Sequence, residues 1–369
     1  MNRFLALRPG RVALVLALAL VLASAAVVAA LAPTAPGNDL LDRPARVGVH
    51  ADQAVLIGIA PAGHRLVAVG ERGIVLLSDD GGSTWRQAQV PVSVALTAVS
   101  FATEKIGWAV GHGGAILRSD DGGEHWTTQL DGRAIGAIEL AAVQAAGGDG
   151  APRRIADAQR LVAEGPDKPL LDVAFADASH GIAVGAFGLA LRTADGGRSW
   201  QSIRSHLPNP QGRHLYDVAI DGNVMLIAGE QGALFRSTDG GDHFEAVTTP
   251  YAGSFFGVLP GPGGELLVYG LRGNVFHSTD AGASWTRVEL GQPITVTAGL
   301  RLADGRVVLV DETGRVLGSS DGGASFQPQA VARPFTFTGA VESGSGRLVL
   351  AGARGLTRHV MTPVAKTQP

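Results

Sequence analysis

Few residues in this chain are of types that carry out chemistry, and they are widely spaced. The sequence of 369 residues contains no Cys, which removes thiolate metal ligands, cysteine nucleophiles and disulfides. Its ten His form no H-x-H or H-E-x-x-H pattern, so their spacing indicates no metal site. A Tyr can attack a sugar when a nearby Glu activates it and an Arg cluster holds the substrate. The chain has three Tyr (Tyr216, Tyr251 and Tyr269), and neither Tyr216 nor Tyr269 has a suitable Glu beside it in the sequence.

The composition excludes further classes of protein. Lys and Arg total 30 against 33 Asp and Glu, and the net charge of -3 indicates no basic face for a nucleic acid. The glycine-rich segment Gly111–Gly114 connects two expected strands and opens no helix, so it is no phosphate cradle. Hydrophobic residues make up 46% of the chain, enough for a sizeable core. We therefore expect a folded protein without a cofactor, a metal site or a nucleic-acid partner.

A repeat of 41 residues organises most of the chain. Each copy has an apolar run that leads into a short turn closed by Gly, as in Gly70-Glu-Arg-Gly73. The closing Gly recurs in all seven copies, at Gly73, Gly114, Gly188, Gly232, Gly273, Gly314 and Gly355. The interval from Gly114 to Gly188 is 74 residues, which is 33 more than the period, so this interval contains an insertion.

Six copies continue into a second motif, Ser/Thr-x-Asp-x-Gly-x-x-Trp/Phe. An Asp at a hairpin tip can accept hydrogen bonds from backbone N–H groups two residues on, and Gly permits a positive φ. The leading hydroxyl can bond to the same turn, and the aromatic residue starts the next strand. A calcium loop would need alternating carboxylates and a closing Glu instead. We assign a structural role to the pairs Asp80 and Trp85, Asp121 and Trp126, Asp195 and Trp200, Asp239 and Phe244, Asp280 and Trp285, and Asp321 and Phe326.

Each period contains four short runs with strand character, as in residues 96–101, 106–111, 115–119 and 125–129. Four antiparallel strands per period match one blade of a β-propeller, so the chain is predicted to be an all-β, seven-bladed propeller. The Gly-x-x-Gly element is then the turn between the second and third strands. The seventh copy ends after its third strand, near residue 360. We expect residues 45–51 to supply the missing outer strand and so to close the ring.

The insertion, residues 131–168, follows the outer strand of blade two and precedes the inner strand of blade three. Apolar residues at Ile155, Ala158, Leu161 and Val162 have helical spacing, and a first short helix precedes the breaker at 147–152. The insertion should lie over or beside the face that carries the Gly-x-x-Gly turns. It is either a tolerated surface feature or a lid or docking element.

The N-terminus differs from the rest of the chain. Three Arg precede 21 uncharged residues, 12–32, which is the pattern of a signal peptide or of a membrane anchor. Both interpretations export the globular part, and the absence of Cys excludes a lipid anchor on Cys. We divide the chain into an export segment (1–32), a linker (33–44), the propeller (45–362) and a tail (363–369).

Surface residues that could bind a partner lie at the turns, where a rigid scaffold presents variable loops. The candidates at the Gly-x-x-Gly turns are Arg72, His112, Phe187, Arg272 and Arg354. A second set lies four residues after the closing Gly, on the third strand. It contains Arg118, Arg192 and Arg236, with His277 and His359 as equivalents, and forms either contacts between blades or a basic patch.

The Asp motif resembles the Asp box (BNR repeat) of sialidases and related propellers, but sialidases have six blades and an Arg-Ile-Pro motif that is missing here. The Gly-x-x-Gly turn, the Asp box, seven blades and the export segment together resemble the photosystem II stability and assembly factor family. This resemblance covers about residues 45–362. It implies a lumenal or periplasmic propeller that binds an assembly intermediate of a membrane complex through an Arg patch, for which Arg118, Arg192 and Arg236 match the motif. The Ala/Arg/Gly-rich composition and the insertion depart from a plastid or cyanobacterial propeller.

We therefore expect an exported, non-enzymatic scaffold, periplasmic and either free or anchored by residues 12–32. Its partner would be a membrane protein or an envelope complex such as an exporter. The alternative is an Asp-box glycoside hydrolase or a glycan-binding module, which an acidic cluster or a Tyr and Glu pair near the central axis would favour.

Overall fold

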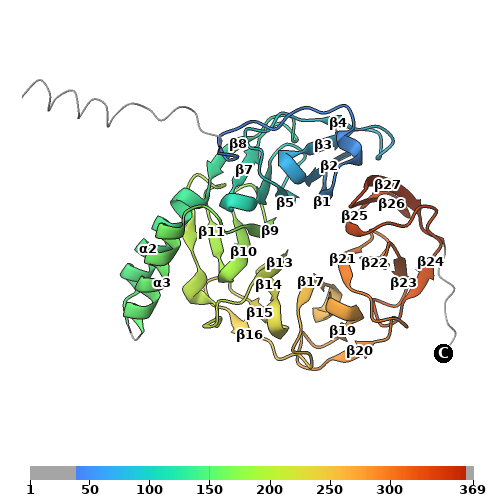
Figure 1. Ribbon diagram of the computed structural model, residues 1–369. Coiled ribbons are helices and arrows are strands. Elements are labelled where there is room, and N and C mark those ends of the chain that lie inside the picture. Colours follow the sequence, from blue (N-terminus) through green and yellow to red (C-terminus); the bar gives the residue numbers. More distant parts are fainter. Residues whose placement is uncertain (1–38, 149, 363–369) are drawn as a thin grey trace, which may run out of the picture.

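Seven antiparallel sheets surround a central opening in the computed structural model of the chain (Figure 1). The structure describes residues 39–148 and 150–362, and the expected export segment and tail lie outside the described residues. Six sheets have four strands and the seventh has three. The predicted seven-bladed propeller is confirmed. No helix among the described residues is long and apolar enough to cross a membrane.

The strands follow one another from the centre of the ring to its rim in each blade. The inner strands are β1 (Leu56–Ala62), β5 (Leu96–Phe101), β9 (Leu170–Phe175), β13 (Leu215–Asp221), β17 (Phe255–Pro260), β21 (Val296–Arg301) and β25 (Phe337–Gly344). The second strands are β2 (Arg65–Gly70), β6 (Gly107–Gly111), β10 (Gly181–Gly185), β14 (Val224–Gly229), β18 (Leu266–Gly270), β22 (Val307–Asp311) and β26 (Arg347–Gly352). The third strands are β3 (Val75–Ser78), β7 (Ile116–Ser119), β11 (Ala190–Thr193), β15 (Leu234–Ser237), β19 (Val275–Ser278), β23 (Val316–Ser319) and β27 (Gly355–Val360). The outer strands are β4 (Arg86–Gln87), β8 (Thr127–Leu130), β12 (Gln201–Ser202), β16 (Glu245–Ala246), β20 (Thr286–Val288) and β24 (Gln327–Gln329).

The core lies between neighbouring blades. Strands β6, β10, β18 and β22 are buried along their whole length, because each face of a blade packs against the next blade. This explains why the second strand of each repeat is a continuous apolar run rather than an alternating one. Trp108 of β6 shows the arrangement: its ring stacks on Phe175 of blade three with the centroids 3.4 Å apart.

The Asp boxes form the hairpins between the third and outer strands. In blade one, Ser78 Oγ donates to Asp80 Oδ1 at 2.9 Å and accepts from Gly82 N at 2.8 Å, while Asp80 Oδ1 accepts from Thr84 N at 2.9 Å. Gly82 has φ of 85°, a conformation that favours Gly. Hydrogen bonds from Ser199 and neighbouring groups lower the pKa of Asp195 to about 2, so this box carboxylate is charged at neutral pH. In all six boxes the Gly N–H donates to the oxygen of the leading Ser or Thr hydroxyl.

The third-strand arginines connect blades. Arg118 Nη1 donates to Gly196 O at 2.7 Å, Arg192 Nη1 pairs with Asp242 at 2.6 Å, and Arg236 Nη1 donates to Ala281 O. Each acceptor belongs to the Asp box of the next blade. The structure therefore places these three residues between blades, the first of the two arrangements that the sequence allowed. Their guanidinium groups are engaged in holding the ring together.

The equivalent of these arginines in blade seven is Arg358, and not His359 as the sequence spacing suggested. The turn of blade seven is one residue tighter, so Val349 pairs with Arg358 where Val67 of blade one pairs with Leu77. Arg358 Nη1 donates to Ser83 Oγ of the blade-one Asp box at 2.6 Å. A shift of one residue exchanges the two faces of a strand, which is why counting from Gly355 gave the wrong residue.

The predicted closing strand is wrong. Residues 45–48 are not a strand of blade seven but run along the outer edge of blade one, where Ala45 N donates to Val90 O at 2.9 Å. The side chain of Gln87 also bonds Arg46 O and Gly48 N, both at 3.0 Å. Leu41 is buried in the core of blades one and two, so the chain approaches from that side. The ring instead closes through the inner strands, where Thr338 Oγ1 donates to Leu56 O at 2.7 Å.

The insertion forms two helices, α2 (Gly132–Ala146) and α3 (Ala151–Glu164), at the outer side of blades two and three (Figure 1). Ile135 is buried in the core that these blades share. Glu139 of α2 is also buried and accepts a hydrogen bond from Ser202 of β12, while Arg204 lies 3.6 Å away. These contacts hold the insertion against blades two and three.

Candidate functional site

The turns between second and third strands form one face of the ring, which we call the turn face. Five of them are single 3-10 turns: η2 (Glu71–Gly73), η3 (His112–Gly114), η4 (Ala186–Gly188), η6 (Glu230–Gly232) and η8 (Leu271–Gly273). The middle residue of each is left-handed, with φ of 55° at Arg72, 56° at Phe187 and 57° at Arg272. Residues other than Gly rarely take this conformation, and it is costly for bulky side chains.

The structure places the five predicted turn residues on this face with exposed side chains: Arg72, His112, Phe187, Arg272 and Arg354. Blade six differs, because Asp311 replaces the first Gly of its turn. The buried Asp311 carboxylate accepts from Thr313 N, Arg315 N and Arg315 Nε. In this turn the middle residue, Thr313, is not left-handed, and the Asp311 side chain bonds the turn in addition to the left-handed Gly314 (φ of 89°).

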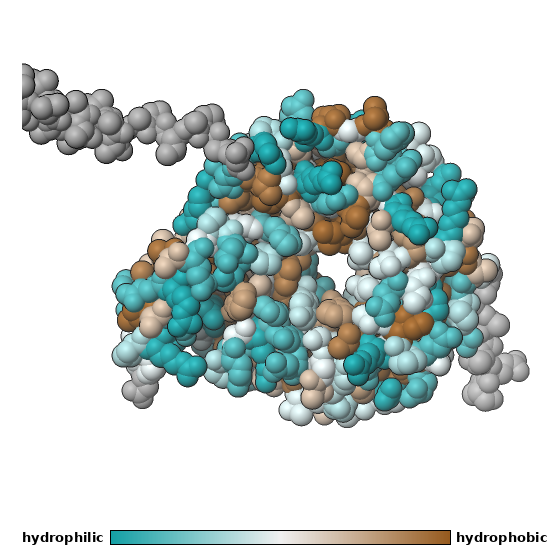
Figure 2. Space-filling model, in the orientation of Figure 1, coloured by the Kyte–Doolittle hydropathy of each residue, from teal (hydrophilic) through white to brown (hydrophobic). Residues whose placement is uncertain are grey.

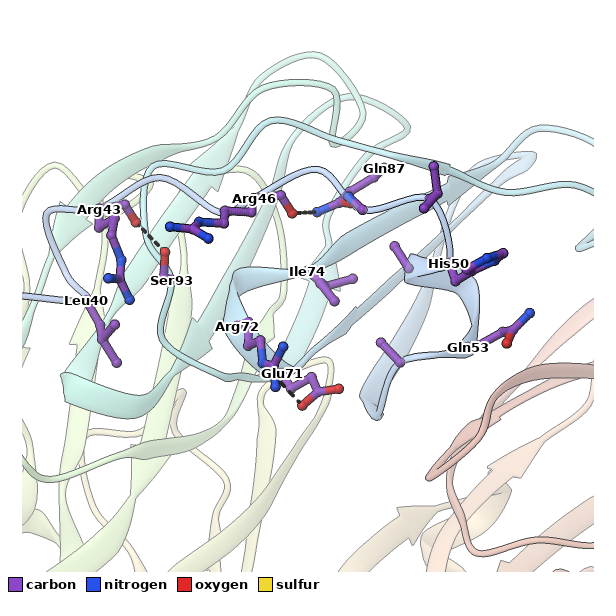
Figure 3. A pocket seen from close by; sticks show the side chains of 14 residues that line it. Leu40, Arg43, Arg46, His50, Gln53, Glu71, Arg72, Ile74, Gln87 and Ser93 are labelled. Atoms are coloured by element: carbon purple, nitrogen blue, oxygen red, sulfur yellow. Dashed lines mark hydrogen bonds and ion pairs between the residues drawn. The ribbon is translucent and has the colours of Figure 1, made fainter.

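A groove crosses the edge of the turn face at blade one (Figure 3). Residues 40–54, which we call the strap, form one wall, and η2 forms the other. The strap includes the 3-10 turn η1 (Ala51–Gln53), and Ser93 Oγ donates to the strap carbonyls of Arg43 and Pro44 at 2.7 and 3.0 Å. The groove has a volume of about 830 Å³.

The groove is basic and partly apolar. Arg43, Arg46 and Arg72 line it together with a single acid, Glu71 (Figure 3). Arg43 and Arg46 are exposed, and their guanidinium groups make no hydrogen bond or ion pair with any other described residue. Four of the seven exposed large hydrophobic residues in the described chain lie on the strap or directly after it: Leu40, Val47, Val49 and Val55. Exposed apolar residues are often found where a protein contacts another molecule.

A row of aromatic rings lies at the turn-face end of blades three to five. Phe187 contacts His214 with ring centroids 4.9 Å apart, His214 lies 6.3 Å from Tyr216, and Tyr216 lies 5.2 Å from Phe256. Lys168, at the end of the insertion, lies 5.2 Å from the Phe187 ring. The Phe187 N–H donates to His214 Nδ1 at 2.8 Å, which leaves Nε2 as the protonated nitrogen of a neutral ring.

Two acids meet in the wall of the central opening, which Figure 2 shows at the middle of the ring. Asp172 of β9 accepts from Val218 N at 2.8 Å, and Asp217 of β13 accepts from Val258 N at 2.9 Å. The two side chains also influence each other's titration. Burial raises the pKa of both groups, and for Asp172 the nearby negative charge of Asp217 adds to the effect.

This pair gives a testable dependence of stability on pH. A carboxyl group with a raised pKa in the folded state stabilises the protein at low pH, and that contribution is lost as the pH rises through the folded-state pKa. We expect the free energy of unfolding to fall between pH 5 and pH 8. Asp172→Asn keeps an acceptor for Val218 N and removes one charge, so it should stabilise the protein at pH 8 by about 1–2 kcal/mol. Denaturant titrations at both pH values measure the effect. If the free energy of unfolding changes equally between pH 5 and pH 8 in both proteins, this account is contradicted.

Neither Tyr216 nor Tyr269 has a pKa shifted in the direction that a Tyr nucleophile needs. Tyr269 lies near the two acids, and its pKa is raised by burial and by the charge of Asp217. Tyr216 has a pKa raised by burial and then by Glu230. A Tyr that acts as a nucleophile needs the opposite shift. Among the described residues no group of three or more His, Asp or Glu could hold a metal ion.

The fold defines a class, the seven-bladed propeller with Asp-box hairpins. Residues 77–151 and 155–251 match the family described as photosynthesis system II assembly factor YCF48. The photosystem II assembly lipoprotein Ycf48 of Synechococcus sp. (strain CC9902) is 39% identical over 74 residues. That match spans 20% of this chain and 22% of the relative's length.

Solved structures with the same fold include members of that family. YCF48 bound to D1 peptide superposes with a TM-score of 0.62 and 17% identity, over 89% of this chain and 100% of the other. YCF48 from Cyanidioschyzon merolae superposes with a TM-score of 0.60 and 17% identity, over 85% of this chain and 97% of the other. The Niastella koreensis GH74 enzyme superposes with a TM-score of 0.58 and 14% identity, over 83% of this chain and 52% of the other. The predicted resemblance to the photosystem II assembly factor family is confirmed over residues 77–151 and 155–251, and the chain folds as a seven-bladed propeller with Asp boxes.

Proposed function

We propose that this chain is an exported, non-enzymatic assembly factor that binds an extended segment of a membrane-protein partner on its turn face. The observation that carries the proposal is the basic, partly apolar groove beside Arg72, in a ring whose other arginines mostly form ion pairs or bonds between blades. A family member has been solved with a D1 peptide, which supports a peptide as the ligand class. Without a Cys for lipid attachment, the chain would be held at the membrane by residues 12–32 or be free in the periplasm.

Affinity recovery of the tagged, full-length protein from detergent-extracted membranes tests this function. We expect a stoichiometric integral membrane protein. Replacing Arg72, Arg272 and Arg354 with Ala should reduce its recovery several-fold without changing the melting temperature, because the Arg72 side chain is 83% exposed and Arg272 and Arg354 are also exposed. Unchanged recovery would remove the turn arginines from the binding face. Recovery of the propeller alone would reject the proposed function.

A glycan-binding or hydrolytic role is the second candidate. The acid pair Asp172 and Asp217 near the central opening is the feature that favours it, because paired carboxyls can act on glycosidic bonds. Both carboxylates are, however, already used by backbone N–H groups of the next blade. Binding on a sugar array that Asp172→Asn abolishes would support this candidate over the first.

A further inference from the structure

Blade seven has an open edge within the part of the chain that the structure describes. There it has three strands where each of the other six blades has four, and β27 is its outermost strand (Figure 1). In other blades the carbonyl of the residue two positions after the closing Gly accepts a hydrogen bond from the backbone N–H that directly follows the outer strand. Val75 O accepts from Ala88 N at 2.9 Å, and Leu234 O accepts from Val247 N at 2.8 Å. Blade seven has no such bond among its described residues.

The register identifies the outward-facing backbone groups. Leu356 pairs with Ala351 as Val75 pairs with Val69, so Leu356 takes the place of Val75. Backbone groups of a strand point to the same side at every second residue, so those of Arg358 and Val360 also point outwards. A row of unpaired N–H and C=O groups is a template for another strand. The turn η1 covers only the start of this edge, next to Gly355.

A second observation points to a missing partner. His359 is 9% exposed, and its Nε2 is buried without a hydrogen-bond partner. His359 pairs with Leu348 as Ser78, the first residue of an Asp box, pairs with Leu66. Blade seven has no Asp box, so the hairpin that satisfies the Ser hydroxyl in other blades is absent here. A buried polar atom without a partner is unusual in a folded protein.

Neither described end of the chain fills the edge. The strap lies along blade one, where Ala45 N bonds Val90 O. At the other end, Thr362 is held at blade six, where its N and Oγ1 donate to Gln329 Oε1 at 2.9 and 2.6 Å. Val360 is 67% exposed on the edge strand, and an apolar residue so placed favours an apolar neighbour.

We propose that β27 accepts an extended segment of the partner polypeptide, which pairs antiparallel with it as the fourth strand of blade seven. This inference rests on the proposed function and names how the partner is recognised. Backbone hydrogen bonds to Leu356, Arg358 and Val360 supply the affinity, as in other cases of strand addition. Specificity comes from an apolar side chain beside Val360 and from a polar group that reaches His359 Nε2.

Two variants of the full-length protein separate backbone pairing from side-chain effects. Arg358→Pro removes the outward N–H, and Pro is tolerated on edge strands where that N–H faces solvent. Arg358→Ala keeps the N–H, and both variants lose the bond to Ser83. We expect the recovery of the membrane-protein partner to fall at least tenfold for Arg358→Pro relative to Arg358→Ala. If Arg358→Pro does not fold, Val360→Pro and Val360→Ala form the same comparison.

Hydrogen exchange of the isolated protein provides the second readout. The amides of Arg358 and Val360 should exchange fast in the isolated protein and become protected in the complex. Protection in the isolated protein would overturn the proposal. If deletion of residues 363–369 then restores fast exchange, the chain's own tail covers the edge of β27. If protection grows with protein concentration, a second copy of the chain covers it. Equal recovery of the partner by the Pro and Ala variants would reject strand pairing but not the proposed function. If the unaltered chain recovers no membrane protein, the proposed function is rejected as well.

Discussion

Trp108→Ala should be the most destabilising single substitution among those considered, lowering the free energy of unfolding by about 3–5 kcal/mol. Trp108 is fully buried, stacks on Phe175 of blade three, and lies 5.3 Å from the Arg118 guanidinium. Its Nε1 donates to Gln129, which in turn donates to Gly196 O of blade three. The substitution leaves a cavity at the junction of two blades and removes a hydrogen bond. Denaturant unfolding measures the effect.

The matched control is Trp108→Phe, which retains an aromatic ring on Phe175 and should cost clearly less than the Ala variant. A loss below about 1 kcal/mol for Trp108→Ala would show that the site collapses around the cavity, contrary to a ring whose blades are packed rigidly.

Reversing the charge of the strap should have the largest effect on binding. Arg43→Glu combined with Arg46→Glu should weaken partner binding at least tenfold, with most of the change in the association rate and in its salt dependence. Folding should be unaffected, because these exposed guanidinium groups make no hydrogen bond or ion pair with any other described residue. The control is Arg198→Glu with Arg287→Glu, the same change of charge at exposed positions off the turn face. Equal weakening by both pairs would mean that net charge, and not the groove, controls binding.

The repeat allowed the ring to be predicted because each blade uses the same local chemistry. The closing Gly, the Asp of each box and the apolar second strand recur once in each sequence repeat, and each repeat folds into one blade. The helices of the insertion could be found in the same way, since the spacing of Ile155, Ala158 and Leu161 is helical.

The strap and the edge of blade seven could not be predicted in this way, because they depend on contacts between distant segments. Residues 45–51 have strand-like alternation, but Leu41 and Gln87 direct them to blade one. The turn of blade seven is one residue tighter, which moved the blade-bridging position from His359 to Arg358. The basic groove was missed because Arg43 lies in the expected linker (33–44) and Arg46 lies in the segment expected to close blade seven (45–51). Their closeness to Arg72 follows only from the folded strap.

The most direct test of the central claim, that the turn face binds the partner, is cross-linking from single cysteines, which the absence of native Cys makes possible. Ala353→Cys places a thiol on the turn face, and Ala283→Cys places one on the exposed Asp-box turn of blade five at the opposite end of the blades. With a short thiol-directed cross-linker in native membranes, we expect an adduct with the membrane-protein partner from Ala353→Cys and none from Ala283→Cys. Equal adducts from both positions, or an adduct from Ala283→Cys alone, would contradict the assignment of the turn face.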